Sequence, residues 1–70
     1  MTAAELAKRG GGVIVSAPGW AGGSPVRVVS AGMLPNGKVA VRYQEVNCRT
    51  RAVIVHVDPD FQVTLRGGGR

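Results

Sequence analysis

The alternation of apolar and polar residues around one turn is the feature that most constrains the fold of this chain. Residues 25–33 (PVRVVSAGM) and residues 38–46 (KVAVRYQEV) flank the tetrapeptide LPNG at residues 34–37. Proline presets the first central position of a β-turn, and Asn-Gly tolerates a positive φ. This stretch therefore predicts a β-hairpin.

Alternation also divides the side chains of the second strand between two faces. Val39, Val41 and Tyr43 share one face, whereas Lys38 and Arg42 share the other. We expect the first face to line the core and the second to meet water or a partner.

A second pair of apolar segments flanks the turn signal Asp-Pro-Asp at residues 58–60. Residues 50–57 (TRAVIVHV) precede it and residues 61–66 (FQVTLR) follow it, which predicts a second hairpin. Residues 53–57 are apolar on both faces apart from His56. This strand is therefore expected to be central in the sheet or covered on both sides.

The last strand alternates more regularly. Phe61, Val63 and Leu65 are expected to point inward, and Thr64 and Arg66 outward. With residues 13–16 as a further candidate, the chain predicts an all-β fold, a small antiparallel barrel or sandwich of four to five strands. Its size is that of SH3-like or OB-like domains.

A short helix or arm is expected before the β domain. Thr2 and Glu5 have the spacing of a capping box, and three glycines at residues 10–12 end the helical pattern. The predicted organisation is a flexible N-terminal arm over residues 1–12, one small β domain over residues 13–66 and a disordered Gly-rich tail over residues 67–70.

A domain of this size needs support beyond its own core. A chain of 70 residues buries only about 60% of the surface that it exposes when unfolded. The single cysteine and single histidine exclude an internal disulfide and a four-ligand zinc site within one chain. No metal or cofactor is therefore expected, and association with other protein chains is the favoured source of stability.

The stretch GGGVIVSAPGWAGGSP, residues 10–25, allows two interpretations. In the first, residues 13–15 form the first strand of the chain's own sheet. In the second, the glycines are hinges that free an assembly arm, which adds as a strand to a neighbouring chain. The partner-binding residues would then be Val13, Ile14, Val15 and Trp20.

The chain is basic, with nine Lys and Arg against four Asp and Glu and a net charge of +5. A basic sheet face could contact phosphates or an acidic protein surface, with Tyr43 as a stacking surface. The candidate contact residues are Arg27, Lys38, Arg42, Arg51 and Arg66. Charged residues make up only 19% of the chain and aromatic residues 4%, which argues against a polyanion groove.

No catalytic constellation is evident. Cys48 and His56 are the only pair that could support nucleophilic catalysis, but they fall in different elements. The glycine clusters lack the lysine and hydroxyl of a phosphate-binding loop. We therefore expect that the protein is not an enzyme.

These observations predict a structural or assembly module that self-associates or docks on a larger assembly, such as a virion coat accessory or decoration protein. The alternative is an SH3-like or OB-like nucleic-acid-binding module. No segment approaches the roughly 18 apolar residues of a membrane span, so no membrane partner is expected. The chain is expected to be intracellular, cytoplasmic when made, with incorporation into a virion or another large assembly as a further option.

Overall fold

The fold is one antiparallel sheet with a short helix packed on it. The computed structural model describes residues 1–46 and 51–67. The elements are α1 (Ala3–Arg9), β1 (Ile14–Ser16), the 3₁₀ helix η1 (Ala21–Gly23), β2 (Val26–Met33), β3 (Val39–Glu45), β4 (Val53–Val57) and β5 (Thr64–Gly67). The expected all-β class is confirmed.

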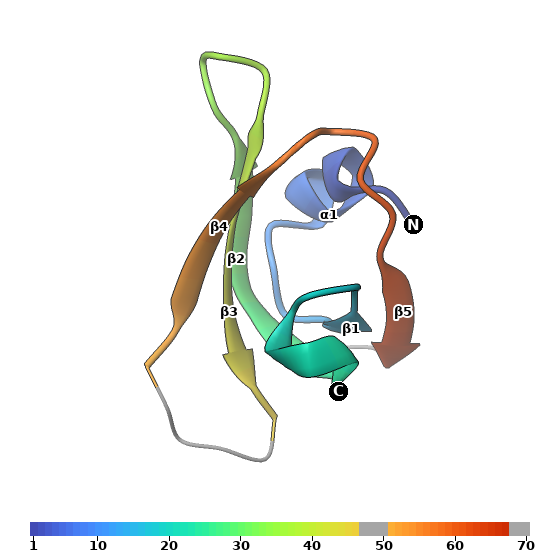
Figure 1. The fold of residues 1–70 in the computed structure, drawn as a ribbon. Coiled ribbons are helices and arrows are strands. Elements are labelled where there is room, and N and C mark those ends of the chain that lie inside the picture. The colour runs from blue at the N-terminus through green and yellow to red at the C-terminus, as the bar shows by residue number, and fades with distance from the viewer. Residues whose placement is uncertain (47–50, 68–70) are drawn as a thin grey trace.

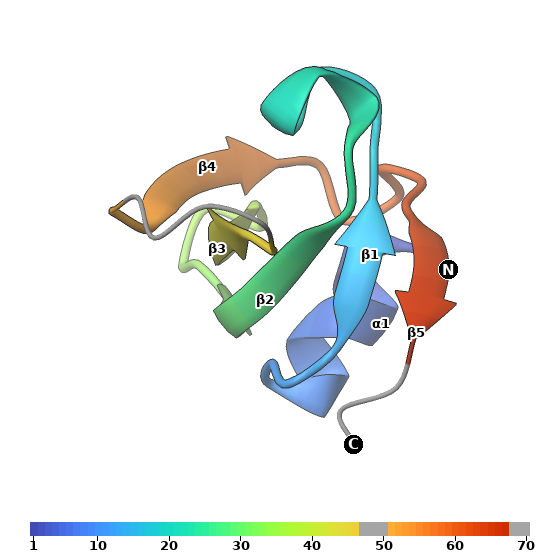
Figure 2. The ribbon, with the colours of Figure 1, turned by 90° about the horizontal axis from the view of Figure 1, so that it is seen from below.

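The sheet is open. Its five strands lie in the order β4-β3-β2-β1-β5, so β4 and β5 are its two edges and lie on opposite sides of the molecule (Figure 1). The expectation of a closed barrel or a sandwich is therefore wrong. Helix α1 packs on β2 and β3 from the concave side of the curved sheet, and Figure 2 shows it close to β2.

The first predicted hairpin is confirmed, and it joins β2 to β3. The amide of Leu34 donates to the carbonyl oxygen of Lys38 at 2.7 Å, and the amide of Gly37 donates to that of Leu34 at 3.0 Å. Gly37 has a φ of +86°, and the Asn36 side chain accepts from the amide of Lys38. The turn thus uses the left-handed backbone that the Asn-Gly pair tolerates.

The second predicted hairpin is wrong, although its turn forms. The amide of Phe61 donates to the carbonyl oxygen of Asp58 at 3.0 Å, but β4 then pairs only with β3, and β5 pairs with β1. The segment between them is hydrogen-bonded to the N-terminus. Ala3 donates to Phe61, Ala4 to Pro59 and Val63 to Met1, at 2.8, 2.9 and 2.8 Å. Because the N-terminal residues occupy these backbone groups, β4 and β5 remain apart and the sheet does not close.

Helix α1 is part of the core and not a free arm. The predicted capping box is present, since the Thr2 hydroxyl accepts from the Glu5 amide and the Glu5 carboxylate accepts from the Thr2 amide. The Thr2 hydroxyl also donates to the Glu5 carboxylate. The hydrogen bond from the Thr2 amide, and after it the one from the hydroxyl, lower the pKa of Glu5. On the opposite face of the helix, Ala3 and Leu6 are completely buried.

The core lies between the helix and the concave face of the sheet. Trp20 stacks on Tyr43 with ring centroids 5.0 Å apart and on Phe61 at 5.6 Å. Around this cluster are the buried residues Ala3, Leu6, Val13, Val15, Ala17, Val26, Val28, Val39, Val41 and Val63. The predicted inward face of the second strand is therefore confirmed.

The glycines at residues 10–12, expected to be a flexible joint, are docked on β2. The amide of Gly12 donates to the carbonyl oxygen of Val28 at 2.8 Å, and the amide of Ala31 donates to that of Gly10 at 3.2 Å. At Gly11 a Cβ atom would lie 2.5 Å from the carbonyl oxygen of Val29. Only glycine permits this approach of backbone to backbone.

We expect Leu6→Ala to lower the free energy of unfolding by about 2–5 kcal/mol, because it leaves a cavity between α1 and the sheet. Lys8→Ala is the matched control, since Lys8 lies on the same helix and is exposed, and a change of less than about 0.5 kcal/mol is expected. Urea unfolding followed by circular dichroism measures both. Equal effects of the two variants would show that α1 is not anchored in the core.

Gly11→Ala is expected to destabilise the fold more than Gly12→Ala. Both glycines have a positive φ, +132° and +78°, but only at Gly11 does an added methyl group meet the backbone of β2. The left-handed conformation alone costs an alanine about 1–2 kcal/mol. Thermal melting of the two variants compares them directly, and a melting temperature for Gly11→Ala at or above that of Gly12→Ala would contradict the close approach.

Candidate functional site

The edge strand β4 carries two neighbouring exposed apolar side chains. Within residues 1–46 and 51–67, β4 pairs with β3 alone. Val53 is 48% exposed and Ile54 55%. The expectation that this strand is central or covered on both sides is therefore wrong, and its apolar residues on two faces do not reflect burial.

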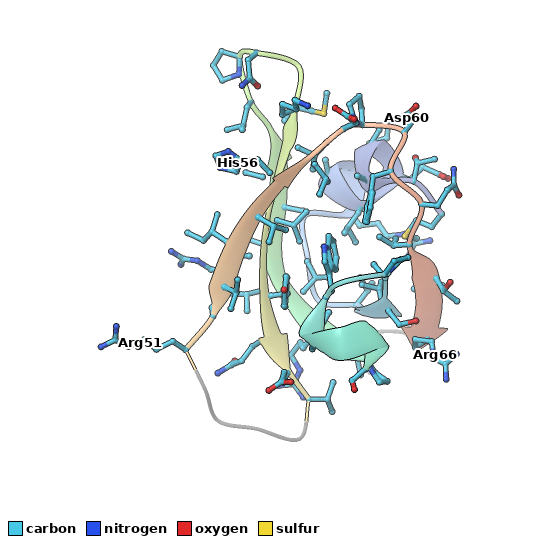
Figure 3. All side chains as sticks on the ribbon, viewed as in Figure 1. Arg51, His56, Asp60 and Arg66 are labelled. Atoms are coloured by element: carbon cyan, nitrogen blue, oxygen red, sulfur yellow. The ribbon has the colours of Figure 1, made fainter. Side chains whose placement is uncertain are left out.

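The residues of β4 divide between the two faces of the sheet. Val53, Val55 and Val57 lie opposite Tyr43, Val41 and Val39, on the concave side. Ile54 and His56 alternate with them and lie on the convex side. Figure 3 shows His56 projecting from β4 away from α1.

β4 carries none of the features by which edge strands commonly avoid pairing. Such features are lysine or proline residues, bulges and inward-pointing charges. The sequence of β4 is VIVHV, and its register with β3 has no shift. Every second residue of an edge strand directs its N–H and C=O groups away from the sheet, so β4 offers a regular row of these groups to another strand.

Opposite charges stand at the two ends of β4. Arg51 precedes the strand and Asp58 follows it, and both are exposed. Figure 3 shows Arg51 at one end of the strand, projecting to the same side as His56. The Asp58 carboxylate forms an ion pair with the Nζ of Lys38, which lies next to β3.

The opposite edge, β5, is shorter and less regular. It has four residues, and its register with β1 shifts between Ile14 and Val15. Leu65 is 45% exposed, contrary to its predicted inward position, whereas Val63 is buried as expected. Arg66 is exposed on this edge.

The residues assigned to an assembly arm lie within the chain's own fold. Val13, Val15 and Trp20 are buried in its core. Ile14 belongs to β1, which pairs with β2 on one side and β5 on the other. In this arrangement these residues are not available to a partner, because the glycines that were expected to be hinges hold the segment against β2.

The candidate basic residues divide between the convex side of the sheet and the β5 edge. Arg27 and Arg42 lie on the convex face, since Arg27 is opposite Gln44 and Arg42 opposite Ser30. Arg51 and Arg66 lie at opposite edges of the sheet (Figure 3).

The remaining candidates for anion contact are engaged elsewhere. Lys38 pairs with Asp58. Tyr43 is buried and stacked on Trp20, so its ring is not open to a nucleic-acid base.

Cys48 and His56 were the residues considered for catalysis and metal binding. Cys48 lies outside the described residues, and His56 is exposed. Within the described part of the chain, no group of three His, Cys, Asp or Glu side chains could hold a metal ion. None of its helices is long and apolar enough to cross a membrane.

The β4 edge was not recognised in the sequence, although its signal was present. An apolar run on both faces is typical of a strand buried on both sides, but an edge strand with such a run is a site at which another chain can pair. The comparisons with known proteins do not decide between these two interpretations of the apolar run. No family model, curated protein or solved structure matches the chain.

Proposed function

We propose that this protein is a small structural module that self-associates through the open edge of β4. The observation that carries the proposal is the exposure of Val53 and Ile54 on an edge strand that has no bulge, lysine or proline.

Strand addition at this edge would satisfy two requirements at once. An added strand would pair the outward N–H and C=O groups of β4, which gives affinity through backbone hydrogen bonds. It would also cover the side chains of Val53 and Ile54, and burying apolar surface contributes roughly 25 cal/mol per Å². A 70-residue chain, whose own core is small, would gain stability from the association.

Nucleic-acid binding is the second candidate. It is supported by the two exposed arginines on the convex face, Arg27 and Arg42. It is the weaker proposal because the three aromatic rings pack on one another in the core, and proteins that bind single strands usually stack bases on exposed rings. Retention of an oligonucleotide on a filter at low salt, lost as the salt concentration rises, would support it, and no retention would eliminate it.

We expect the protein to associate at high concentration and to dissociate on dilution. Ile54→Lys, which places an edge-blocking charge on β4, should raise the dissociation constant by about tenfold, or ~1.4 kcal/mol. Light scattering and sedimentation velocity compare the mass with the 7.2 kDa of one chain.

Met33→Lys is the matched control, because Met33 is 56% exposed but lies on β2. Its association should equal that of the unaltered protein. A mass of one chain at every concentration up to the limit of solubility would overturn the proposal, and so would equal effects of the two lysine variants.

A further inference from the structure

The segment that contains β4 is complementary to itself. It begins with the cation Arg51, continues through the apolar strand Val53–Val57 and ends with the anion Asp58. Two copies of such a segment, laid antiparallel, bring the basic end of each beside the acidic end of the other. We infer that the occupant of the β4 edge is the β4 strand of a second copy, paired antiparallel about a twofold axis at Val55; this inference rests on the proposed function.

The twofold symmetry restricts the register of this pairing. Strands that continue one sheet about a twofold axis keep the same face on the same side, so residues that lie opposite each other must share a face. Overlap of the whole strand then sets Val53 opposite Val57, Ile54 opposite His56, and Val55 opposite its own counterpart. On the concave side the contact is a ladder of valines from both copies, and β-branched cross-strand pairs stabilise a sheet.

Charge complementarity at the ends reinforces this register. Alternation along β4 puts Asp58 on the convex face with Ile54 and His56, and Arg51 projects to the same side (Figure 3). In the twofold pair, Asp58 of one copy lies opposite Ala52 of the other, directly beside Arg51. Asp58 already forms an ion pair with Lys38, next to β3, but its side chain is 63% exposed, so Arg51 of the second copy would share this carboxylate with Lys38. The symmetry makes this contact twice.

Head-to-tail pairing of β4 with β5 of a second copy fits less well. Antiparallel pairing would bring the Arg51 end of β4 beside Arg66 at the end of β5, and like charges placed opposite each other are destabilising. β5 also has only four residues and an irregular register with β1. Such an interface does not close by itself and would give rings or filaments, whereas twofold pairing stops at the dimer.

Exchange of the two charges tests the inference. Arg51→Asp puts two anions beside each other at both ends of the pair, and Asp58→Arg puts two cations there. Each variant alone should raise the dimer dissociation constant by about tenfold or more. A 1:1 mixture should recover dimers to within about threefold of the unaltered protein, because both end contacts become opposite in sign.

Arg66→Asp is the matched control for Arg51→Asp, since it makes the same charge change at the other edge and should leave the dimer intact. A mixture that associates no better than its components would overturn the twofold pairing, and so would an equal effect of Arg66→Asp or a species larger than a dimer. In each of these cases the unaltered protein still associates, and the proposed function survives. An unaltered protein that never associates overturns both.

Disulfide trapping tests the register in a Cys48→Ser background. Val55→Cys should cross-link in air, with dissolved oxygen as the oxidant of the two thiols, because directly opposite residues have Cα atoms about 4.5–5.5 Å apart, within the range of a disulfide. Val57→Cys is the matched control on the same face, and its two copies would lie more than about 13 Å apart. Denaturing electrophoresis without reductant reads the dimer, and cross-linking of Val57→Cys as readily as of Val55→Cys would overturn this register.

Discussion

The backbone hydrogen bonds between the N-terminal residues and the segment after β4 determine the shape of this protein. Met1, Ala3 and Ala4 pair with Val63, Phe61 and Pro59 at 2.8 to 2.9 Å, so the segment between β4 and β5 pairs with the N-terminus and does not fold back on β4. The same contacts seat α1, so that Leu6 reaches the core. Pairing of β4 with β5, which would close the sheet, and docking of α1 are therefore alternatives. The chain docks the helix. The consequence is that β4 is left with an open side.

The distribution of aromatic side chains follows from the same arrangement. A core of valines and alanines would leave space beneath a curved sheet, and the stack of Tyr43, Trp20 and Phe61 fills it. Because the three rings are used for packing, the convex face carries arginines without aromatic neighbours among the described residues. Two of the exposed apolar side chains, Val53 and Ile54, lie on the edge strand β4, where a further strand could be added.

Local signals in the sequence predicted the local structure well. The Asn-Gly turn and the capping box of Thr2 and Glu5 depend on neighbouring residues only, and both formed as expected. The inward face of the second strand also followed from its period of two. What could not be predicted was the competition between distant segments. The turn at residues 58–60 indicates that the chain reverses there, but whether β4 or the N-terminus pairs with the residues that follow depends on contacts that no local pattern describes.

The candidate site shows the same limit of local sequence patterns, which do not say which segment lies beside a strand. The run VIVHV was interpreted as a buried strand because apolar residues on both faces usually need cover, and that reasoning about its chemistry still holds. The error was to assume that the rest of the chain covers this strand, since Val53 and Ile54 are exposed. Strand β1, which was considered for an arm, completes its own sheet, whereas β4, which was considered central, has the open edge. The flanking charges distinguish the possible occupants: a strand with Arg51 at one end and Asp58 at the other fits its own antiparallel copy better than it fits the basic end of β5.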